Sequence, residues 1–252
     1  MQFELNNQKL FHNKWENILP TLPDRSVDFL LTDPPYGITP IKWDVKVDWK
    51  SFWEEIHRIC KPSATMLMFA SGKFIPVAIN SNLSNYRYEL IWEKFNAVGH
   101  LDANRRPLRA HEQMLIFCRK WKSSTYNPQK TKGKKHKTGG LTNKPVHYAG
   151  ANRATEEIIT DLYHPRSVLK FDSRVKGVSR HPTAKPLELV TWLVKSFSNR
   201  GDIVLDPFCG SGTTLAATLL TNRRGIGCEI GEDYFNNACK WLKEIDGELK
   251  NA

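Results

Sequence analysis

The chain has 252 residues, of which 40% are hydrophobic and 25% charged, a balance that excludes wholesale disorder and is sufficient for a packed core. Lys and Arg outnumber Asp and Glu by 37 to 26, which gives a formal charge of +11 and favours a polyanionic partner. No apolar stretch is long enough to span a bilayer and the amino terminus lacks the pattern of a signal peptide, so we expect a cytoplasmic protein without membrane segments.

Hydrophobic runs in the first half alternate between strand and helix. A short apolar run over 27–33 stops at two prolines, as a buried strand that ends in a functional loop would. Residues 49–60 carry apolar side chains at helical spacing, and 65–70 is a second apolar run. Strand, helix and strand in this order predict a parallel α/β sheet, which the runs at 88–92 and 113–118 extend.

The middle of the chain differs in charge from its flanks. Between Gln113 and Thr155 there is no acidic residue, whereas there are ten Lys or Arg residues. Five lysines gather beside glycines within 130–140. This composition predicts a polar, flexible and strongly basic insertion.

Regular patterns resume in the last third. A helix is predicted from Pro186, followed by a strand at 203–206, a helix over 213–220, a strand at 225–229 and a last helix with its apolar face at 235–245. This βαβα unit is of the kind that binds nucleotides at its strand ends.

The cysteines are five in number and form no C-x-x-C pair. Zinc sites usually need such a pair, so we predict no metal site and expect reduced thiols that lie mostly in the core. They are Cys60, Cys118, Cys209, Cys228 and Cys239.

A glycine-rich loop separates the strand at 203–206 from the next helix. Gly210 and Gly212 allow a sharp bend and a close approach to a ligand, although the loop lacks the ending of a Walker motif. Glu229 lies 23 residues beyond Asp206 at the next strand end, where an acidic side chain can accept hydrogen bonds from ribose hydroxyls. An acidic entrance suits a cationic adenosine cofactor that carries no phosphate, such as a sulfonium methyl donor.

Asp33-Pro34-Pro35-Tyr36 follows the first predicted strand. An exocyclic base amine is a poor nucleophile, because its lone pair is delocalised into the ring. The Asp33 carboxylate and the Pro34 carbonyl can accept both amine hydrogens, and Pro35 stiffens the loop. Tyr36 offers an aromatic face to a base that has swung out of the duplex.

Three motifs together closely resemble the β-class amino-DNA methyltransferases. They are the Asp-Pro-Pro-Tyr motif at 33–36, His-Pro-Thr-Ala-Lys-Pro at 181–186, and Asp-Pro-Phe-Cys-Gly-Ser-Gly-Thr-Thr at 206–214. As in that family, the catalytic motif comes first, an insertion follows, and the cofactor motif comes last. The resemblance covers about residues 10 to 245.

The resemblance implies a Rossmann-like α/β methyltransferase fold that binds S-adenosylmethionine. We expect a mostly parallel seven-stranded sheet with helices on both faces, a circularly permuted motif order and a basic insertion. Residues 1–119 would form the catalytic half, 120–180 a target-recognition insertion, and 181–252 the cofactor-binding half of the same domain.

The resemblance assigns a role only to residues that match a motif of the family. The catalytic motif is Asp33, Pro34, Pro35 and Tyr36. Thr183 and Lys185 match a segment that in relatives approaches the methionine end of the cofactor. The cofactor residues would be Asp206, Phe208, Gly210, Ser211, Gly212, Thr213 and Glu229, together with Thr183 and Lys185.

These implications predict a site-specific, adenine-specific DNA methyltransferase that flips its target base out of double-stranded DNA. Asp33 favours adenine, because enzymes for the N4 amine of cytosine more often begin this motif with Ser in the family. A cytosine enzyme and an inactive DNA-binding protein remain the alternatives. Related motifs also methylate RNA or protein, but the motif order and the basic insertion argue against those substrates. Whether the chain forms a homodimer, and whether a restriction enzyme accompanies it, stays open.

Overall fold

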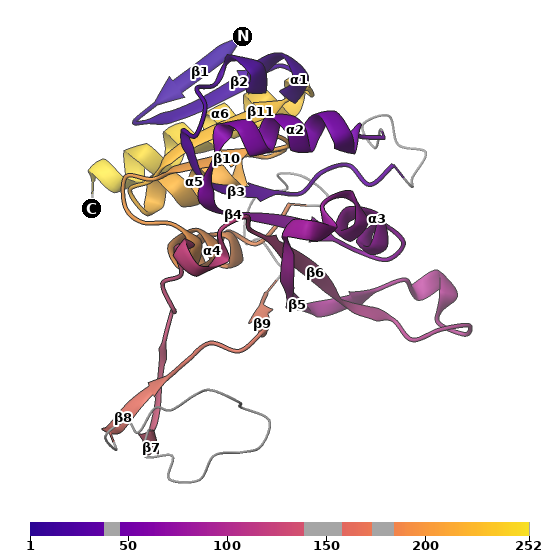
Figure 1. Cartoon of the computed structure of the whole chain (residues 1–252), viewed down its shortest axis with the longest axis vertical. Helices are drawn as coiled ribbons and strands as arrows, with labels where there is room; N and C mark the ends of the chain where they lie inside the picture. The colour runs from indigo at the N-terminus through magenta and orange to yellow at the C-terminus, as the bar shows by residue number, and fades with distance from the viewer. Residues whose placement is uncertain (38–45, 139–157, 173–183, 252) are drawn as a thin grey trace. The chain divides into compact units, whose positions relative to one another are not determined.

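The computed structural model describes residues 1–37, 46–138, 158–172 and 184–251 (Figure 1). The chain divides into two compact units. The first comprises 1–127 and 167–252, and the second comprises 128–166. We describe each unit by itself.

The first unit is built on a nine-stranded sheet in the order β1-β2-β11-β10-β3-β4-β6-β5-β9. Neighbouring strands are parallel, except that β1 runs against β2 and β6 runs against β4 and β5. The mostly parallel sheet expected from the sequence is confirmed, and β1 and β9 extend its seven inner strands at the two edges. The strands are β1 (Gln2–Leu5), β2 (Gln8–His12), β3 (Val27–Thr32), β4 (Cys60–Ala70), β5 (Tyr86–Val98), β6 (Arg109–Phe117), β9 (Val168–Phe171), β10 (Ile203–Asp206) and β11 (Arg224–Glu229).

Helices cover both faces of this sheet, as expected (Figure 1). The helices α1 (Trp15–Ile18), α2 (Trp49–Ile59) and α3 (Phe74–Ser81) pack on one face. The other face carries α4 (Leu187–Phe197), α5 (Thr213–Leu220) and α6 (Glu232–Lys250). Short 3-10 turns lie at Leu19–Thr21, Leu83–Asn85, His100–Asp102 and Trp121–Ser123.

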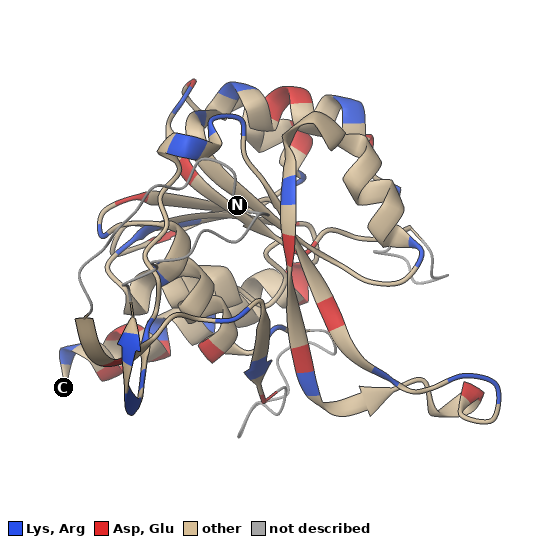
Figure 2. Cartoon of the chain, turned by 60° about the horizontal axis from the view of Figure 1, so that its bottom comes forward, with Lys and Arg blue, Asp and Glu red and all other residues tan. Residues whose placement is uncertain are grey.

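Alternating side chains on β3 explain why both faces need a cover. Leu30 packs among the residues of α2, whereas Phe29 and Leu31 pack against α4. A strand with apolar residues on both sides must be buried on both faces, which is typical of parallel sheets. Figure 2 shows charged residues on the helices and along some strands. In the middle of the strand order, β10, β3 and β4 carry charged residues only near their ends.

The sheet order brings the two halves of the first unit together. The chain steps from β10 to β11 in one direction and from β3 to β4 in the other, so β10 and β3 are neighbours at a reversal of strand order. Ligands in open α/β sheets bind at the carboxyl ends of strands beside such a reversal. Asp33 and Asp206 follow or end these two strands, although they are far apart in the sequence.

The second unit contains an antiparallel pair of strands, β7 (Thr131–Thr138) and β8 (Ile158–Tyr163). The His136 and Tyr163 rings stack with centroids 4.2 Å apart, and the Tyr163 hydroxyl donates to the Lys134 carbonyl over 2.9 Å. In its described part, the lysine-rich segment of the predicted insertion forms a strand. This unit is narrower than the predicted insertion at 120–180, since β9 belongs to the first unit.

All five cysteines are free thiols, as expected, and four of them are buried. Cys239 is half-buried on α6. Among the helices of the described residues, none combines the length and the apolar character that a membrane crossing requires.

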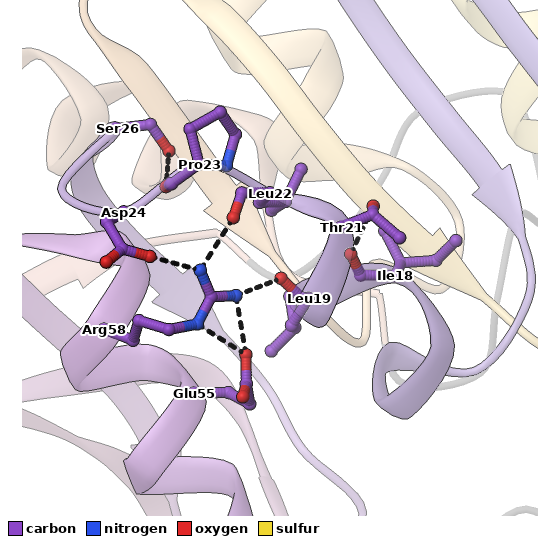
Figure 3. Close-up of polar contacts among 9 residues, drawn as sticks. All are labelled: Ile18, Leu19, Thr21, Leu22, Pro23, Asp24, Ser26, Glu55 and Arg58. Carbon is purple, nitrogen blue, oxygen red and sulfur yellow. Dashed lines mark hydrogen bonds and ion pairs between the residues drawn. The ribbon is translucent and has the colours of Figure 1, made fainter.

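Arg58, at the end of α2, ties this helix to the segment that leads into β3 (Figure 3). Its guanidinium donates to the carbonyls of Leu19 and Leu22 over 2.8 and 2.9 Å. It also forms ion pairs with Asp24 at 2.6 Å and with Glu55 at 2.7 Å. One side chain thus satisfies two carbonyls and two carboxylates at the entry to β3.

We predict that Arg58→Ala lowers the free energy of unfolding by about 1–3 kcal/mol, because it leaves the part-buried carbonyls of Leu19 and Leu22 and the Glu55 carboxylate without their donor. Urea unfolding followed by circular dichroism measures the change. Lys50→Ala, on the exposed side of the same helix, is the matched control and should change stability by less than about 0.5 kcal/mol. Equal effects of the two variants would contradict the structural role of Arg58.

Candidate active site

A cavity of about 670 Å³ opens at the carboxyl ends of β3, β10 and β11. Its volume lies within the range of small-molecule sites, roughly 300–1,000 Å³. Most of the predicted site residues line it: Asp33, Pro34, Pro35, Tyr36, Lys185, Asp206, Phe208, Gly210, Ser211, Thr213 and Glu229. The fold therefore brings the catalytic motif and the cofactor motif to one cavity.

Two predicted residues stand apart from this group. Gly212 is not among the residues that line the cavity. A Cβ atom there would meet the Cβ of Ala238 at 2.9 Å, so Gly212 lets α5 start close against α6. Thr183 lies outside the described residues.

Asp206 anchors the glycine-rich loop from the end of β10. Its side chain is 4% exposed and accepts hydrogen bonds from the Thr214 hydroxyl at 2.6 Å and from the Phe208 amide at 3.2 Å. Burial raises the pKa of this carboxyl to about 7, although the hydrogen bonds from Thr214 and Phe208 act in the opposite direction. The Asp33 carboxylate adds to the increase in pKa.

Gly210 lies at the bend of the same loop. Its φ of +51° is in the left-handed region that favours glycine, and a Cβ atom there would meet nothing within 4 Å. Because Gly210 lines the cavity, a side chain at this position would enter space next to the site. The loop is thus open toward a ligand at Gly210 and closed by packing at Gly212.

Glu229 ends β11 on the same side of the cavity. Its Oε1 accepts a hydrogen bond from the Gly231 amide at 2.6 Å, which holds the side chain in place. Burial raises the pKa of Glu229, opposed by backbone amides that include those of Gly231 and Gly210. A carboxylate has about four acceptor positions, so Glu229 can accept further hydrogen bonds from a ligand.

Asp33 follows β3 at the other end of the cavity. Its Oδ1 accepts a hydrogen bond from the Tyr36 hydroxyl at 3.1 Å, and its Oδ2 forms an ion pair with Lys185. The Tyr36 ring stacks on Phe74 of α3 with centroids 4.4 Å apart and planes 12° from parallel. The four-residue motif is therefore fixed by a hydrogen bond, an ion pair and an aromatic stack.

A chain of alternating charges runs from Asp33 into the sheet. Lys185 Nζ also lies 3.6 Å from Glu112 Oε2 on β6, and Glu112 in turn pairs with Lys94 on β5. Burial by itself raises the pKa of Glu112, but Lys185 and Lys94 outweigh it and the pKa is lowered. Burial likewise lowers the pKa of Lys185, but Asp33 and Glu112 outweigh it and the pKa is raised. Both shifts favour the charged forms of Glu112 and Lys185.

Sequence reasoning missed Glu112 and Lys94, and it assigned Lys185 to the cofactor. Glu112 directly precedes the apolar run at 113–118, and its side chain is 15% exposed. An acidic residue at the start of a buried run is the local signal, but its partners come from other parts of the chain. The lining also includes Trp15, Phe69 and Tyr234, which no motif indicated.

The raised pKa of Asp206 predicts that protein stability falls as the pH rises. Between pH 3.8, the ordinary pKa of an aspartate, and about pH 7, the folded state binds more protons at this group than the unfolded state. The associated stability is complete below the lower value and is lost as the pH passes through about 7. Removal of the ionisable group should remove this pH dependence.

We therefore expect the free energy of unfolding of Asp206→Asn, measured without ligand, to increase relative to that of the natural chain by roughly 2–4 kcal/mol between pH 5 and pH 8. Urea unfolding at both pH values measures the difference. Asp233→Asn, at an exposed position in the first turn of α6, provides a control that should show no such trend. A constant difference between Asp206→Asn and the natural chain would show that Asp206 does not titrate in this range.

Comparisons with known proteins identify the family of this chain. The family model N6_N4_Mtase, described as a DNA methylase, matches residues 27–240. The Type II methyltransferase M.BglII of Bacillus subtilis is 29% identical to this chain, over 96% of the chain and 71% of its own length. The DNA adenine methyltransferase YhdJ of Escherichia coli (strain K12) is 28% identical, over 89% of this chain and 79% of its own.

Solved structures share the fold. The M1.HpyAVI–SAM complex superposes with a TM-score of 0.65 at 25% identity, over 93% of this chain and 98% of its own. The cytosine-N4-specific PvuII DNA methyltransferase also reaches 0.65, over 97% and 93%, but at 14% identity it supports the fold alone. Since the family model spans 27–240, the chain belongs to the N6/N4 family of DNA methylases.

Proposed function

We propose that the chain transfers a methyl group from S-adenosylmethionine to the N6 amine of adenine in double-stranded DNA. The observation that carries this proposal is that Asp33, Asp206 and Glu229 share one cavity. Groups suited to activate an amine thus lie beside groups suited to hold a methyl donor. Membership in the DNA methylase family supports the same reaction.

The residues at β10 and β11 fit S-adenosylmethionine, the methyl donor of the family. Glu229 would accept hydrogen bonds from the ribose hydroxyls, and the bend at Gly210 leaves room for a close backbone approach. Asp206 would hold the loop in shape through Thr214 and Phe208. When bound, the cofactor supplies an electrophilic methyl group on a cationic sulfonium.

Asp33 would activate the target amine as a hydrogen-bond acceptor. Tyr36 and Lys185 each engage one of its oxygens, and a carboxylate keeps further lone-pair positions for the amine hydrogens. With the Pro34 carbonyl as a second acceptor, the amine nitrogen would be drawn toward tetrahedral geometry as positive charge develops on it. The two prolines limit the movement of the loop, so little reorganisation is needed.

Tyr36 would stack on a base that has left the duplex. A target amine inside the helix stack is out of reach, so the base must swing out into the cavity. Phe74 supports the Tyr36 ring, and Trp49 packs on Phe74 with centroids 5.5 Å apart. This aromatic support makes Tyr36 a rigid surface for stacking.

Adenine is the preferred base because the motif begins with Asp33. The resemblance to the family associates Asp with adenine and Ser with the N4 amine of cytosine. YhdJ, whose name specifies adenine, supports this choice. The PvuII DNA methyltransferase, which has a similar fold, is cytosine-N4-specific, so cytosine stays the alternative.

The second unit, with residues 120–180 around it, would recognise the target sequence. Its strand β7 carries four lysines among eight residues, and most of its side chains are exposed. Exposed lysines of this kind neutralise DNA phosphates, so DNA binding should weaken steeply with salt. We propose that the protein acts in the cytoplasm, where its DNA substrate lies.

A methylation assay tests the base. Purified protein is incubated with radiolabelled S-adenosylmethionine and unmethylated genomic DNA, and the digested nucleosides are separated by chromatography. We expect the label in N6-methyladenine. Label in N4-methylcytosine would select the cytosine alternative, and label in neither would favour the inactive DNA-binding protein.

We predict that Asp33→Ala lowers kcat at least about 100-fold while the affinity for S-adenosylmethionine changes little, because Asp33 acts on the amine. Single-turnover kinetics and isothermal titration calorimetry measure the two effects. Asp28→Ala, an acidic residue at the other end of β3, is the control and should preserve kcat. An equal loss of cofactor affinity and kcat in Asp33→Ala would contradict the assignment.

The two loop glycines should differ in effect. Gly210→Ala adds a methyl group beside the cavity, so it should weaken cofactor binding by about 10-fold or more. Gly212→Ala adds one against Ala238, so it should lower the free energy of unfolding by roughly 1–3 kcal/mol. Calorimetry and urea unfolding of both variants distinguish the roles, and a reversed pattern would show that the loop is placed wrongly.

A further inference from the structure

Lys185 is positioned on the catalytic carboxylate rather than on the cofactor loop. It lies just before α4, its side chain is 10% exposed, and its Nζ pairs with Asp33 Oδ2. The same ammonium lies 3.6 Å from Glu112 Oε2 and 4.9 Å from the centre of the Phe69 ring. All four residues line the cavity.

The donors of the ammonium suggest a ligand. An ammonium carries three N–H donors, and the carboxylates of Asp33 and Glu112 can accept two of them. Within the described residues, these two carboxylates are the ion-pair partners of Lys185. A third donor is therefore available to an acceptor that enters the cavity beside Asp33.

Adenine and cytosine share the pattern that this arrangement complements. In each base, the exocyclic amine stands next to an unprotonated ring nitrogen, N1 in adenine and N3 in cytosine. Flipped bases are read by hydrogen bonds to this Watson–Crick edge. An acceptor and a donor in contact with each other, as Asp33 and Lys185 are, match an amine beside a ring acceptor.

We propose that Lys185 donates a hydrogen bond to the ring nitrogen beside the target amine, while Asp33 accepts from the amine itself. This inference rests on the proposed function and makes Lys185 a residue that selects the base. Thymine offers no amine, and in guanine the ring nitrogen at this edge carries a hydrogen. With guanine in the site, Lys185 would face a hydrogen-bond donor instead of an acceptor, which lowers the affinity for this base.

Glu112 and Lys94 act as positioning residues for Lys185. Glu112 is a second carboxylate beside the ammonium, 3.6 Å away, and Lys94 balances the charge of Glu112. A long lysine side chain would otherwise sample many rotamers. Because two carboxylates bind it, the ammonium stays next to Asp33, where the Watson–Crick edge of the flipped base would bind.

An atomic substitution in the DNA tests the contact. The target adenine in a duplex is replaced by 1-deazaadenine, in which the ring nitrogen is a C–H group; for a cytosine target, 3-deazacytosine is used. The natural chain should lose kcat/KM by about 10- to 100-fold on the deaza substrate, as expected for a lost hydrogen bond to a charged group. Lys185→Met should process both substrates within about twofold of each other, because the contact is already absent.

Two further variants keep the test decisive. Lys61→Met removes a lysine that pairs with Asp28 and does not line the cavity, and it should keep the discrimination of the natural chain. Lys185→Arg retains donors and should keep part of the discrimination, which also covers the case that Lys185→Met does not fold. Undiminished discrimination in Lys185→Met would overturn the proposal.

The cofactor supplies the competing assignment. If Lys185 bound the methionine carboxylate, Lys185→Met would weaken S-adenosylmethionine binding about 10-fold or more in calorimetry. We expect a change of less than about threefold, and the larger loss would overturn the proposal. Failure of the natural chain to methylate any DNA would refute the proposed function instead, so the two failures are distinguishable.

Discussion

The buried ammonium of Lys185 is the constraint on which the arrangement of the site depends. A charge taken out of water costs several kcal/mol unless opposite charges meet it at close range. Asp33 and Glu112 meet it from two different strands, and Lys185 itself comes from the segment before α4. The ion pairs are therefore satisfied only when β3, β6 and α4 occupy their places, which couples the position of the Asp33 carboxylate to the packing of the first unit.

The acidic residues of the cavity show how one fold gives the same functional group different properties. Asp206 is almost fully buried among neutral donors, and its pKa is raised to about 7. Glu112 is also buried, but it lies between two lysines and its pKa is lowered. Desolvation favours the neutral form of an acid and a nearby cation favours the charged form, so the neighbours decide which effect dominates.

Some helices and strands could be predicted from local sequence patterns, and others could not. The helix predicted over 213–220 is α5, residue for residue, because an apolar stretch follows a glycine that caps it. The sequence patterns did not predict the strands β1 and β2, because both are short and mix apolar with polar residues. Helix α3 also escaped prediction, because Pro76 stands in its first turn, where a helix tolerates proline but a sequence pattern suggests a break.

The sequence by itself determined the class of fold, the motif at 33–36, the cofactor motif at 206–214 and their order along the chain. These features are local, because a strand end, a sharp loop and a helix start leave their marks within a few residues. Only the tertiary structure decided that Lys185 meets Asp33, that Glu112 belongs to the site and that Gly212 serves the packing of α5 on α6. Each of these depends on residues distant in the sequence, and no local pattern records which distant group will be in contact.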